Sequence, residues 1–256
     1  MHDSDSPALD NSSGCRMRVF ETVCLVTAVG LVVVHAMRFV QAPDLPAWAV
    51  LLAVTLGLPA ADFLSGFVHW AGDTWGRVTT RWIGPRLLVP FRYHHLHPRD
   101  MLRSPFVTTN GDAAMVACFI LGAAFLMPLD SFGWVAVFVV ATGAWGLPTS
   151  QIHKWAHDPR PPHVIRWLQG AGLILQPQNH QRHHRSPFAS HYCITTGWCN
   201  PILERVRFWK ALERVVSWVS GLQPRMDLDV KPVDGARQTE EEDRELKQVI
   251  RKWHES

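Results

Sequence analysis

Histidine residues gather in four short segments whose spacing could place several imidazole rings around a common ion. The chain has 14 histidines in 256 residues. The four segments contain His69 with Asp73; His94, His95 and His97; His153 and His157; and His180, His183 and His184. Residues three or four positions apart share one face of a helix. Each segment therefore predicts a set of side chains that point the same way.

This number of imidazoles predicts two metal ions in one pocket. Neutral imidazole binds iron, zinc, copper or nickel, whereas one tetrahedral zinc ion uses only four ligands. His153 is not followed by the glutamate that would act as general base in a zinc protease, and the sequence contains no Gly-rich dinucleotide fingerprint. We therefore predict that histidine-bound iron reacts with dioxygen, using electrons from a separate protein, and removes hydrogen from an unactivated carbon.

The composition indicates a membrane protein. Hydrophobic residues make up 47% of the chain and charged residues only 18%, whereas a soluble domain carries about a quarter of charged residues. A net charge of +3 is too small to predict a nucleic-acid partner. The five cysteines form no CxxC pair and predict reduced thiols. Cys193 and Cys199 are close enough to raise the question of metal binding, but packing is the favoured interpretation.

Four apolar stretches predict helices that position the histidines. They run from about Val19 to Val40, from Ala47 to near Phe67, from Ala113 to Met127 and from Phe132 to about Leu147. A spanning helix needs about 20 apolar residues, so the third and fourth are short. Either flanking residues complete them or they form a re-entrant hairpin. We predict an all-α integral membrane protein with about four transmembrane helices and a cytosolic His-rich dimetal cap. Residues 1–18 would form an N-terminal cytosolic tail, 19–222 the membrane domain and 223–256 a charged C-terminal tail.

The arginines and lysines predict the orientation. The connection from Arg77 to Arg103 and the segment after Leu147 are rich in basic residues, whereas 41–46 and 128–131 contain none. Because basic loops stay cytosolic, both termini and all four histidine segments are expected on the cytosolic face. The membrane would be the inner membrane in a bacterium or the endoplasmic reticulum in a eukaryote.

Five longer segments resemble the plasmanylethanolamine desaturase family, which is related to plastid fatty-acid desaturases. They are ADFLSGFVHWAGDTWG (61–76), PFRYHHLHP (90–98), TTNGDAA (108–114), QIHKWAH (151–157) and NHQRHHRSPFASHYCITTGWCNP (179–201). The resemblance covers about residues 55 to 215. It implies a four-helix membrane desaturase that forms the vinyl ether double bond of plasmalogens from 1-O-alkyl ethanolamine phospholipids.

The resemblance also implies the cofactors, the partners and the ligands. The reaction would use two iron ions, dioxygen as co-substrate and two electrons from a b-type cytochrome with its reductase. The implied ligands are His69, His94, His95, His153, His157, His180, His183 and His184. Asp73 would be a ligand or an acid that orients one, while His97 and His191 have weaker claims. The plastid relatives are expected to carry glutamine where this chain has His180, which favours the plasmalogen branch.

Two alternatives remain open at this point. The same scaffold could desaturate or hydroxylate an acyl chain. The histidines could instead bind metal in a membrane protein that is not an enzyme. A transporter would place ionisable ligands near the middle of the membrane, whereas these segments lie at and beyond the ends of the predicted spans.

Other polar and aromatic residues receive simpler interpretations. His2, His35, His163 and His254 lack spaced partners and are predicted at a surface or interface. Asp62, within an apolar stretch, is equally consistent with a functional acid and with a helix cap or arginine partner. Asn110 and Asn179 could bind metal through water or cap a helix, and capping is the favoured interpretation. Trp70, Trp75, Trp82 and Trp155 are predicted to anchor at the membrane interface.

Overall fold

The computed structural model describes residues 14–42, 45–78, 80–81 and 83–225, and every regular element in this part of the chain is helical. The elements are α1 (Cys15–Val40), α2 (Ala47–Thr74), η1 (Gly84–Leu88), α3 (Val89–Leu96), η2 (Asp100–Arg103), α4 (Phe106–Ala124), α5 (Leu129–Gly146), α6 (Thr149–His157), α7 (His163–Gly170), α8 (Pro177–His183), α9 (Asn200–Arg205) and α10 (Phe208–Ser220). Residues 1–13 of the N-terminal tail and residues 226–256 of the C-terminal tail lie outside the described residues. The division of the chain at residues 18 and 222 therefore stays a prediction.

Four helices are long and apolar enough to cross a membrane, as the sequence predicts. The third begins at Phe106 rather than Ala113 and is 19 residues long, because the polar segment 108–112 is itself helical. The fourth runs through α5 and α6 as a stretch of 29 residues, Leu129–His157. Flanking residues thus complete both short stretches, and the re-entrant hairpin is not formed.

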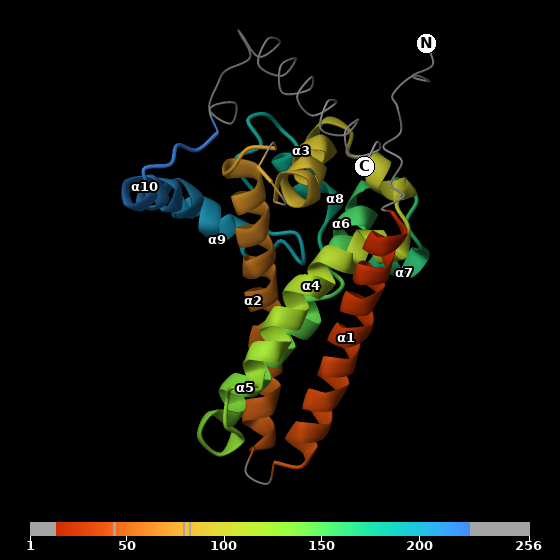
Figure 1. Cartoon of the computed structure of the whole chain (residues 1–256), viewed down its shortest axis with the longest axis vertical. Coiled ribbons are helices and arrows are strands. Elements are labelled where there is room, and N and C mark those ends of the chain that lie inside the picture. Colours follow the sequence, from red (N-terminus) through yellow and green to blue (C-terminus); the bar gives the residue numbers. More distant parts are fainter. Residues whose placement is uncertain (1–13, 43–44, 79, 82, 226–256) are drawn as a thin grey trace.

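Small residues allow the long helices to pack closely. Helix α2 packs against α5 and α1 against α4, while α4 and α5 contact each other (Figure 1). A Cβ atom added at Gly57 of α2 would lie 2.7 Å from the Cβ of Ala141 of α5. Between α1 and α4, Ala28 and Ala114 are fully buried. In a bilayer, burying apolar side chains between helices gains little free energy, because lipid is equally apolar. Helices therefore associate through close van der Waals packing of this kind.

Replacing Gly57 with valine is expected to destabilise the bundle by about 1–3 kcal/mol, the usual cost of overpacking a filled interior. The matched control is Gly30→Val on α1, because a Cβ at Gly30 meets nothing within 4 Å. Thermal unfolding of the purified proteins, followed by size-exclusion chromatography, measures the difference. Equal melting temperatures for the two variants would contradict the packing described for α2 and α5.

At the end of the bundle that lies far from the histidine segments, α1 is fixed to the last turn of α4. His35 Nε2 lies 2.9 Å from the carbonyl oxygen of Leu121, and the Arg38 guanidinium donates to the carbonyls of Ala124 and Met127. These bonds satisfy carbonyls that a helix C-terminus leaves unpaired. His35 is fully buried, so its prediction as a surface or interface histidine was wrong.

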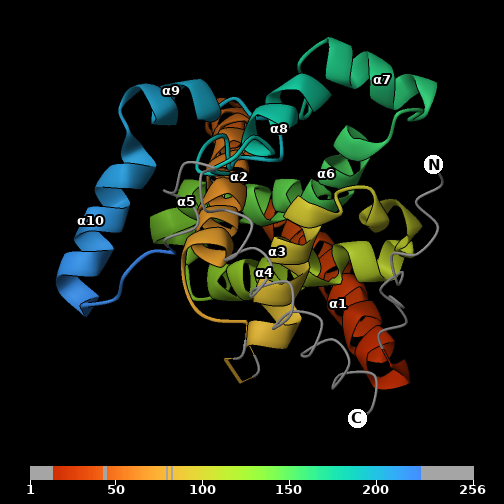
Figure 2. The same cartoon turned by 90° about the horizontal axis from the view of Figure 1, so that it is seen from above.

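The short helices gather at the opposite end of the bundle. Figure 1 shows α3, α6 and α8 there, and Figure 2 shows α7 and α10 extending to the sides. Trp70 of α2 is only 2% exposed because Trp209 of α10 stacks on it at 5.8 Å. The prediction that Trp70 anchors at the membrane interface was therefore wrong, while Trp82 lies outside the described residues.

Candidate metal centre

Four helices bring all the predicted histidine ligands into two adjacent groups. Helix α2 contributes His69 and Asp73, α3 contributes His94 and His95, α6 contributes His153 and His157, and α8 with its C-cap contributes His180, His183 and His184. The five-histidine group consists of His94, His153, His157, His180 and His184. The Asp73 group consists of His69, Asp73, His95 and His183. Within each group the possible ligand atoms all lie within 4.8 Å of one another.

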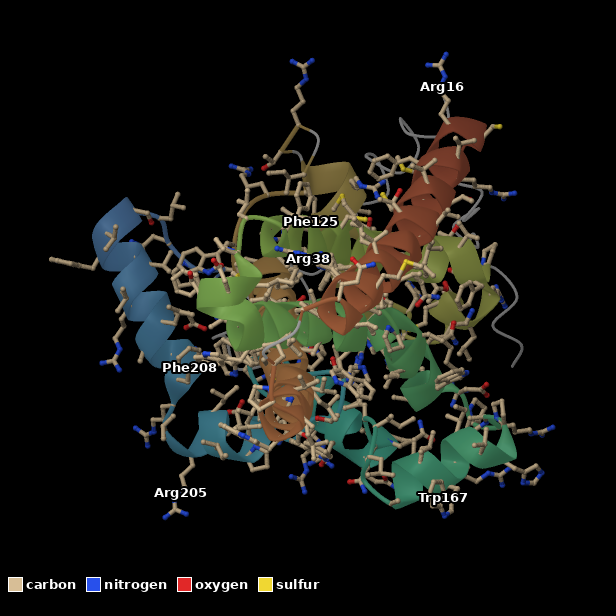
Figure 3. The ribbon with its side chains drawn as sticks, turned by 90° about the horizontal axis from the view of Figure 1, so that it is seen from below. Arg16, Arg38, Phe125, Trp167, Arg205 and Phe208 are labelled. Carbon is tan, nitrogen blue, oxygen red and sulfur yellow. The ribbon has the colours of Figure 1, made fainter. Side chains whose placement is uncertain are left out.

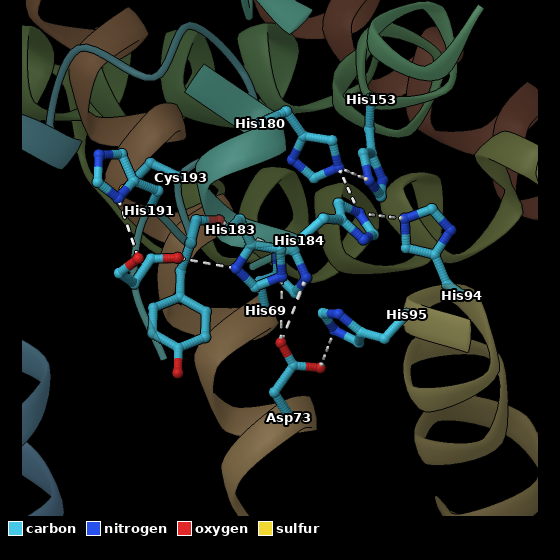
Figure 4. Close-up of polar contacts among 12 residues, drawn as sticks. His69, Asp73, His94, His95, His153, His180, His183, His184, His191 and Cys193 are labelled. Carbon is cyan, nitrogen blue, oxygen red and sulfur yellow. Dashed lines mark hydrogen bonds and ion pairs between the residues drawn. The ribbon is translucent and has the colours of Figure 1, made fainter. Parts of the chain in front are cut away.

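The five-histidine group has its Nε2 atoms turned toward one point (Figure 4). His180 Nε2 lies 2.7 Å from the Nε2 atoms of His153 and His157. His184 Nε2 lies 3.0 Å from that of His180 and 3.1 Å from that of His94. Nitrogens that bind one ion at about 2.1 Å are themselves roughly 3 Å apart. The separations in this group are therefore those of ligands around one ion.

The Asp73 group is built around a single buried carboxylate. Asp73 Oδ1 lies 3.0 Å from His95 Nε2, while Oδ2 lies 3.4 Å from His69 Nε2 and 3.6 Å from His183 Nε2. Figure 4 shows the three rings converging on this carboxylate. Asp73 itself is 1% exposed. A cation among these atoms would be held by three neutral ligands and one negative charge.

Neighbouring histidines in the sequence belong to different groups. His94 and His95 divide between the two groups with ring centroids 6.0 Å apart, and His183 and His184 divide in the same way at 5.5 Å. Consecutive residues on a helix point about 100° apart, so each pair reaches into two neighbouring sites. The His94–His95 pair and the His183–His184 pair therefore place the two groups side by side.

Backbone carbonyls fix the orientation of two rings in the Asp73 group. His69 Nδ1 lies 3.1 Å from the carbonyl oxygen of Tyr192, and His183 Nδ1 lies 2.8 Å from that of Ser190. A carbonyl only accepts, so each Nδ1 carries the proton and each Nε2 keeps its lone pair for a metal. Residues 190–192 lie within the last motif that carries the resemblance, but no spacing in the sequence predicts this role for their carbonyls.

Burial lowers the pKa of four imidazoles that lie outside the spans. Burial, and then the neighbouring imidazoles, hold the pKa values of His94, His180 and His183 well below the usual value for histidine. For His184 the same causes lower the pKa to about 2. These rings stay unprotonated near neutral pH, which is the form that binds metal.

Two buried atoms have the properties expected where a cation binds. Within the described part of the chain, Asp73 Oδ2 and His183 Nε2 are buried without a hydrogen-bond partner. A buried polar atom without a partner is costly, and these two point toward each other. A metal ion would satisfy both, and imidazole with carboxylate is a donor set that suits iron. The residues present therefore fit a pair of metal ions.

His97 and His191 lie outside both groups. The ring of His97 stacks on Tyr93 at 4.7 Å. His191 Nδ1 contacts Ser190 Oγ at 3.1 Å, and the ring lies to one side of the Asp73 group in Figure 4.

Four further polar residues have roles in packing. Cys193 is fully buried, and Cys199 Sγ donates to the carbonyl of Pro59, as the packing interpretation predicts. Asn110 and Asn179 cap no helix, so that prediction was wrong. Asn110 lies inside α4 and donates to the carbonyl of Phe106 at 2.8 Å, and Asn179 donates to the Gln176 side chain at 3.3 Å.

Asp62 anchors the loop of residues 190–199, which we call the anchor loop. Its carboxylate accepts backbone N–H bonds from Thr195 at 3.1 Å, Thr196 at 2.7 Å, Gly197 at 2.9 Å and Cys199 at 3.0 Å. Asp62 is fully buried. The side chain is therefore neither a helix cap nor an arginine partner. It holds the loop whose carbonyls orient His69 and His183.

Replacing Asp62 with asparagine is expected to cost about 1–3 kcal/mol of stability, because one carboxylate oxygen becomes an amide NH2 that faces N–H donors and leaves them without an acceptor. The control is Asp130→Asn at the far end of the bundle, where Asp130 is exposed and accepts from Ser131 N. Melting temperatures of the purified proteins would show the effect. If Asp62→Asn melted at the same temperature as the control, the contact between the Asp62 carboxylate and the anchor loop would not be needed for stability.

Comparison with known proteins places the chain among lipid desaturases. A family described as the lipid desaturase domain matches residues 58–227. The chain is 40% identical over 225 residues to a plasmanylethanolamine desaturase of Myxococcus xanthus, covering 87% of this chain and 80% of that protein. It is 38% identical to plasmanylethanolamine desaturase 1 of Mus musculus, with 70% and 69% covered. It is 34% identical to the chloroplastic fatty acid desaturase 4 of Arabidopsis thaliana, with 68% and 54% covered. No solved structure matches the chain significantly.

Proposed function

Because the chain belongs to the lipid desaturase family, we propose that it forms the vinyl ether double bond of plasmalogens from 1-O-alkyl ethanolamine phospholipids. Two of its relatives are named plasmanylethanolamine desaturases. The observation that supports this chemistry in the chain itself is a pair of adjacent groups that could each hold a metal ion, at one end of four helices long and apolar enough to cross a membrane. Both reactants, the lipid chain and the oxidant, would meet at that end of the bundle.

Each group would hold one iron ion. The five-histidine group would bind through imidazole nitrogens alone, and the Asp73 group through three imidazoles and a carboxylate. The iron pair would supply the oxidation of an unactivated carbon by dioxygen. In the overall reaction two hydrogens leave the alkyl chain, and dioxygen ends as water with two further electrons and two protons.

The protein would contribute position and exclusion of water. The carbonyls of Ser190 and Tyr192 hold two rings with Nε2 toward the metal. His69, His180 and His183 are almost completely buried, which keeps water from the oxidising site. The alkyl chain would approach from the bilayer along the apolar helices, so that one methylene pair is held near the irons.

Electrons would come from a b-type cytochrome with its reductase, and the site would face the cytosol. The basic connections around the histidine segments support this orientation. The membrane would be the inner membrane of a bacterium or the endoplasmic reticulum of a eukaryote.

A lipid comparison tests the proposed activity. Cells that lack plasmalogens are fed a 1-O-alkylglycerol and analysed by mass spectrometry with and without the protein. We expect acid-labile lipids that have lost two hydrogens only when the wild-type protein is present, and none with His184→Ala. A well-expressed wild-type protein that gives no such lipid would refute the plasmalogen assignment.

A second candidate is desaturation of an acyl chain, because the chain also resembles a chloroplastic fatty acid desaturase. The same extracts distinguish the two reactions. A desaturated acyl product would have lost two hydrogens from its fatty acid and would survive mild acid, while a hydroxylated product would gain one oxygen.

A further inference from the structure

Helix α10 has three distinct faces. Trp209, Leu212, Glu213 and Val216, spaced by three and four residues, pack against the rest of the protein. Val215, Trp218 and Val219 form a second stripe with the same spacing, and they are 53%, 86% and 71% exposed. Lys210 and Arg214 form a third stripe, which is exposed and basic. The three stripes divide the helix into roughly equal thirds.

The packed face fixes α10 at the polar end of a membrane span. Trp209 stacks on Trp70, and Phe208 lies edge-on to Phe63 with ring centroids 5.6 Å apart. Trp70 lies four residues, or about 6 Å, from the end of α2 at Thr74. Helix α10 is therefore level with the border of the apolar bundle rather than above it, and it runs across the bundle axis (Figure 1).

The exposed apolar stripe has no cover within the described part of the chain. Seen from the end of the bundle that carries Arg38 and Phe125, α10 lies beside the membrane-spanning helices and no helix lies across it (Figure 3). The adjoining surface of α2 is also apolar, since Phe67 is 41% exposed. The stripe thus continues the lipid-facing surface of the bundle.

We propose that α10 lies flat in the interface of the bilayer. Val215, Trp218 and Val219 would enter the acyl region, while Lys210 and Arg214 would face the headgroups and water. A helix with apolar and basic residues segregated in this way binds at the boundary between headgroups and acyl chains. Trp218 suits that boundary, because the amphipathic ring of tryptophan is favoured at the membrane interface. This inference rests on the membrane-spanning helices alone and does not depend on the reaction.

Spin-label accessibility in lipid nanodiscs tests the proposal. Val219→Cys and the matched control Arg214→Cys are made in a Cys15→Ser background, because Cys15 is exposed. The background protein is labelled in parallel to subtract other thiols. We expect the label at position 219 to be more accessible to oxygen than to a water-soluble nickel chelate, and the order to reverse at position 214.

Two results would overturn the proposal. Nickel accessibility at position 219 equal to that at 214 would place the stripe in water. Dipolar broadening between labels at position 219, lost on dilution with unlabelled protein, would show instead that a second copy of the chain covers this stripe.

Discussion

Replacing Asp73 with asparagine is expected to abolish lipid desaturation while the protein stays folded in the membrane. Among the described residues, Asp73 is the only carboxylate in either candidate metal group, and its two oxygens contact three histidine rings. Asparagine keeps the shape of the side chain but removes the charge that would offset a cation. Mutation of residues that merely orient a ligand costs 10–100-fold in metal affinity or activity, so we expect a loss of at least about 100-fold.

The control for this prediction is Asp130→Asn, which removes a carboxylate at the opposite end of the bundle. Both variants are compared with the wild type for protein level, membrane insertion and vinyl ether lipid. If Asp73→Asn retained more than about a tenth of wild-type product, Asp73 would not be a metal ligand.

Alanine at His180 is expected to eliminate product, whereas alanine at His97 should leave most of it. His180 Nε2 lies within 3.0 Å of the Nε2 atoms of His153, His157 and His184, so its removal opens the centre of the five-histidine group. His97 lies outside both groups. Its loss would remove a contact with Tyr93 and no metal ligand. The same lipid analysis measures both variants.

A matching loss in the two variants would show that His97 also binds metal, and the two groups would then be incomplete as described. Full activity of His180→Ala would remove the five-histidine group from the mechanism.

The sequence predicts the helical membrane architecture and every histidine in the two groups. The spans and the histidine segments follow from local patterns, whereas the full set of eight ligands was implied by the resemblance to a known family. Runs of apolar residues specify spans, and spacing of three or four residues puts two side chains on one helix face. The His69 and Asp73 pair and the His153 and His157 pair are predicted in this way.

The division into two groups could not be predicted, because it depends on how four helices meet. Nothing local shows that His94 and His95 serve different sites, or that His184 lies with His94 across 90 residues of sequence. The same limit explains Asp62, whose partners lie 133 to 137 residues later. His35 was predicted at a surface or interface because its partner, the carbonyl of Leu121, carries no side-chain signal.

The metal content of the purified protein tests the central claim most directly. Wild type, His94→Ala and His95→Ala are loaded with iron under identical conditions and analysed for iron per chain. Because His94 belongs to the five-histidine group and His95 to the Asp73 group, we expect two irons in the wild type and one in each variant. The variant with both substitutions should bind no iron. One iron per chain in the wild type, or both irons retained in either single variant, would contradict a centre of two adjacent metals.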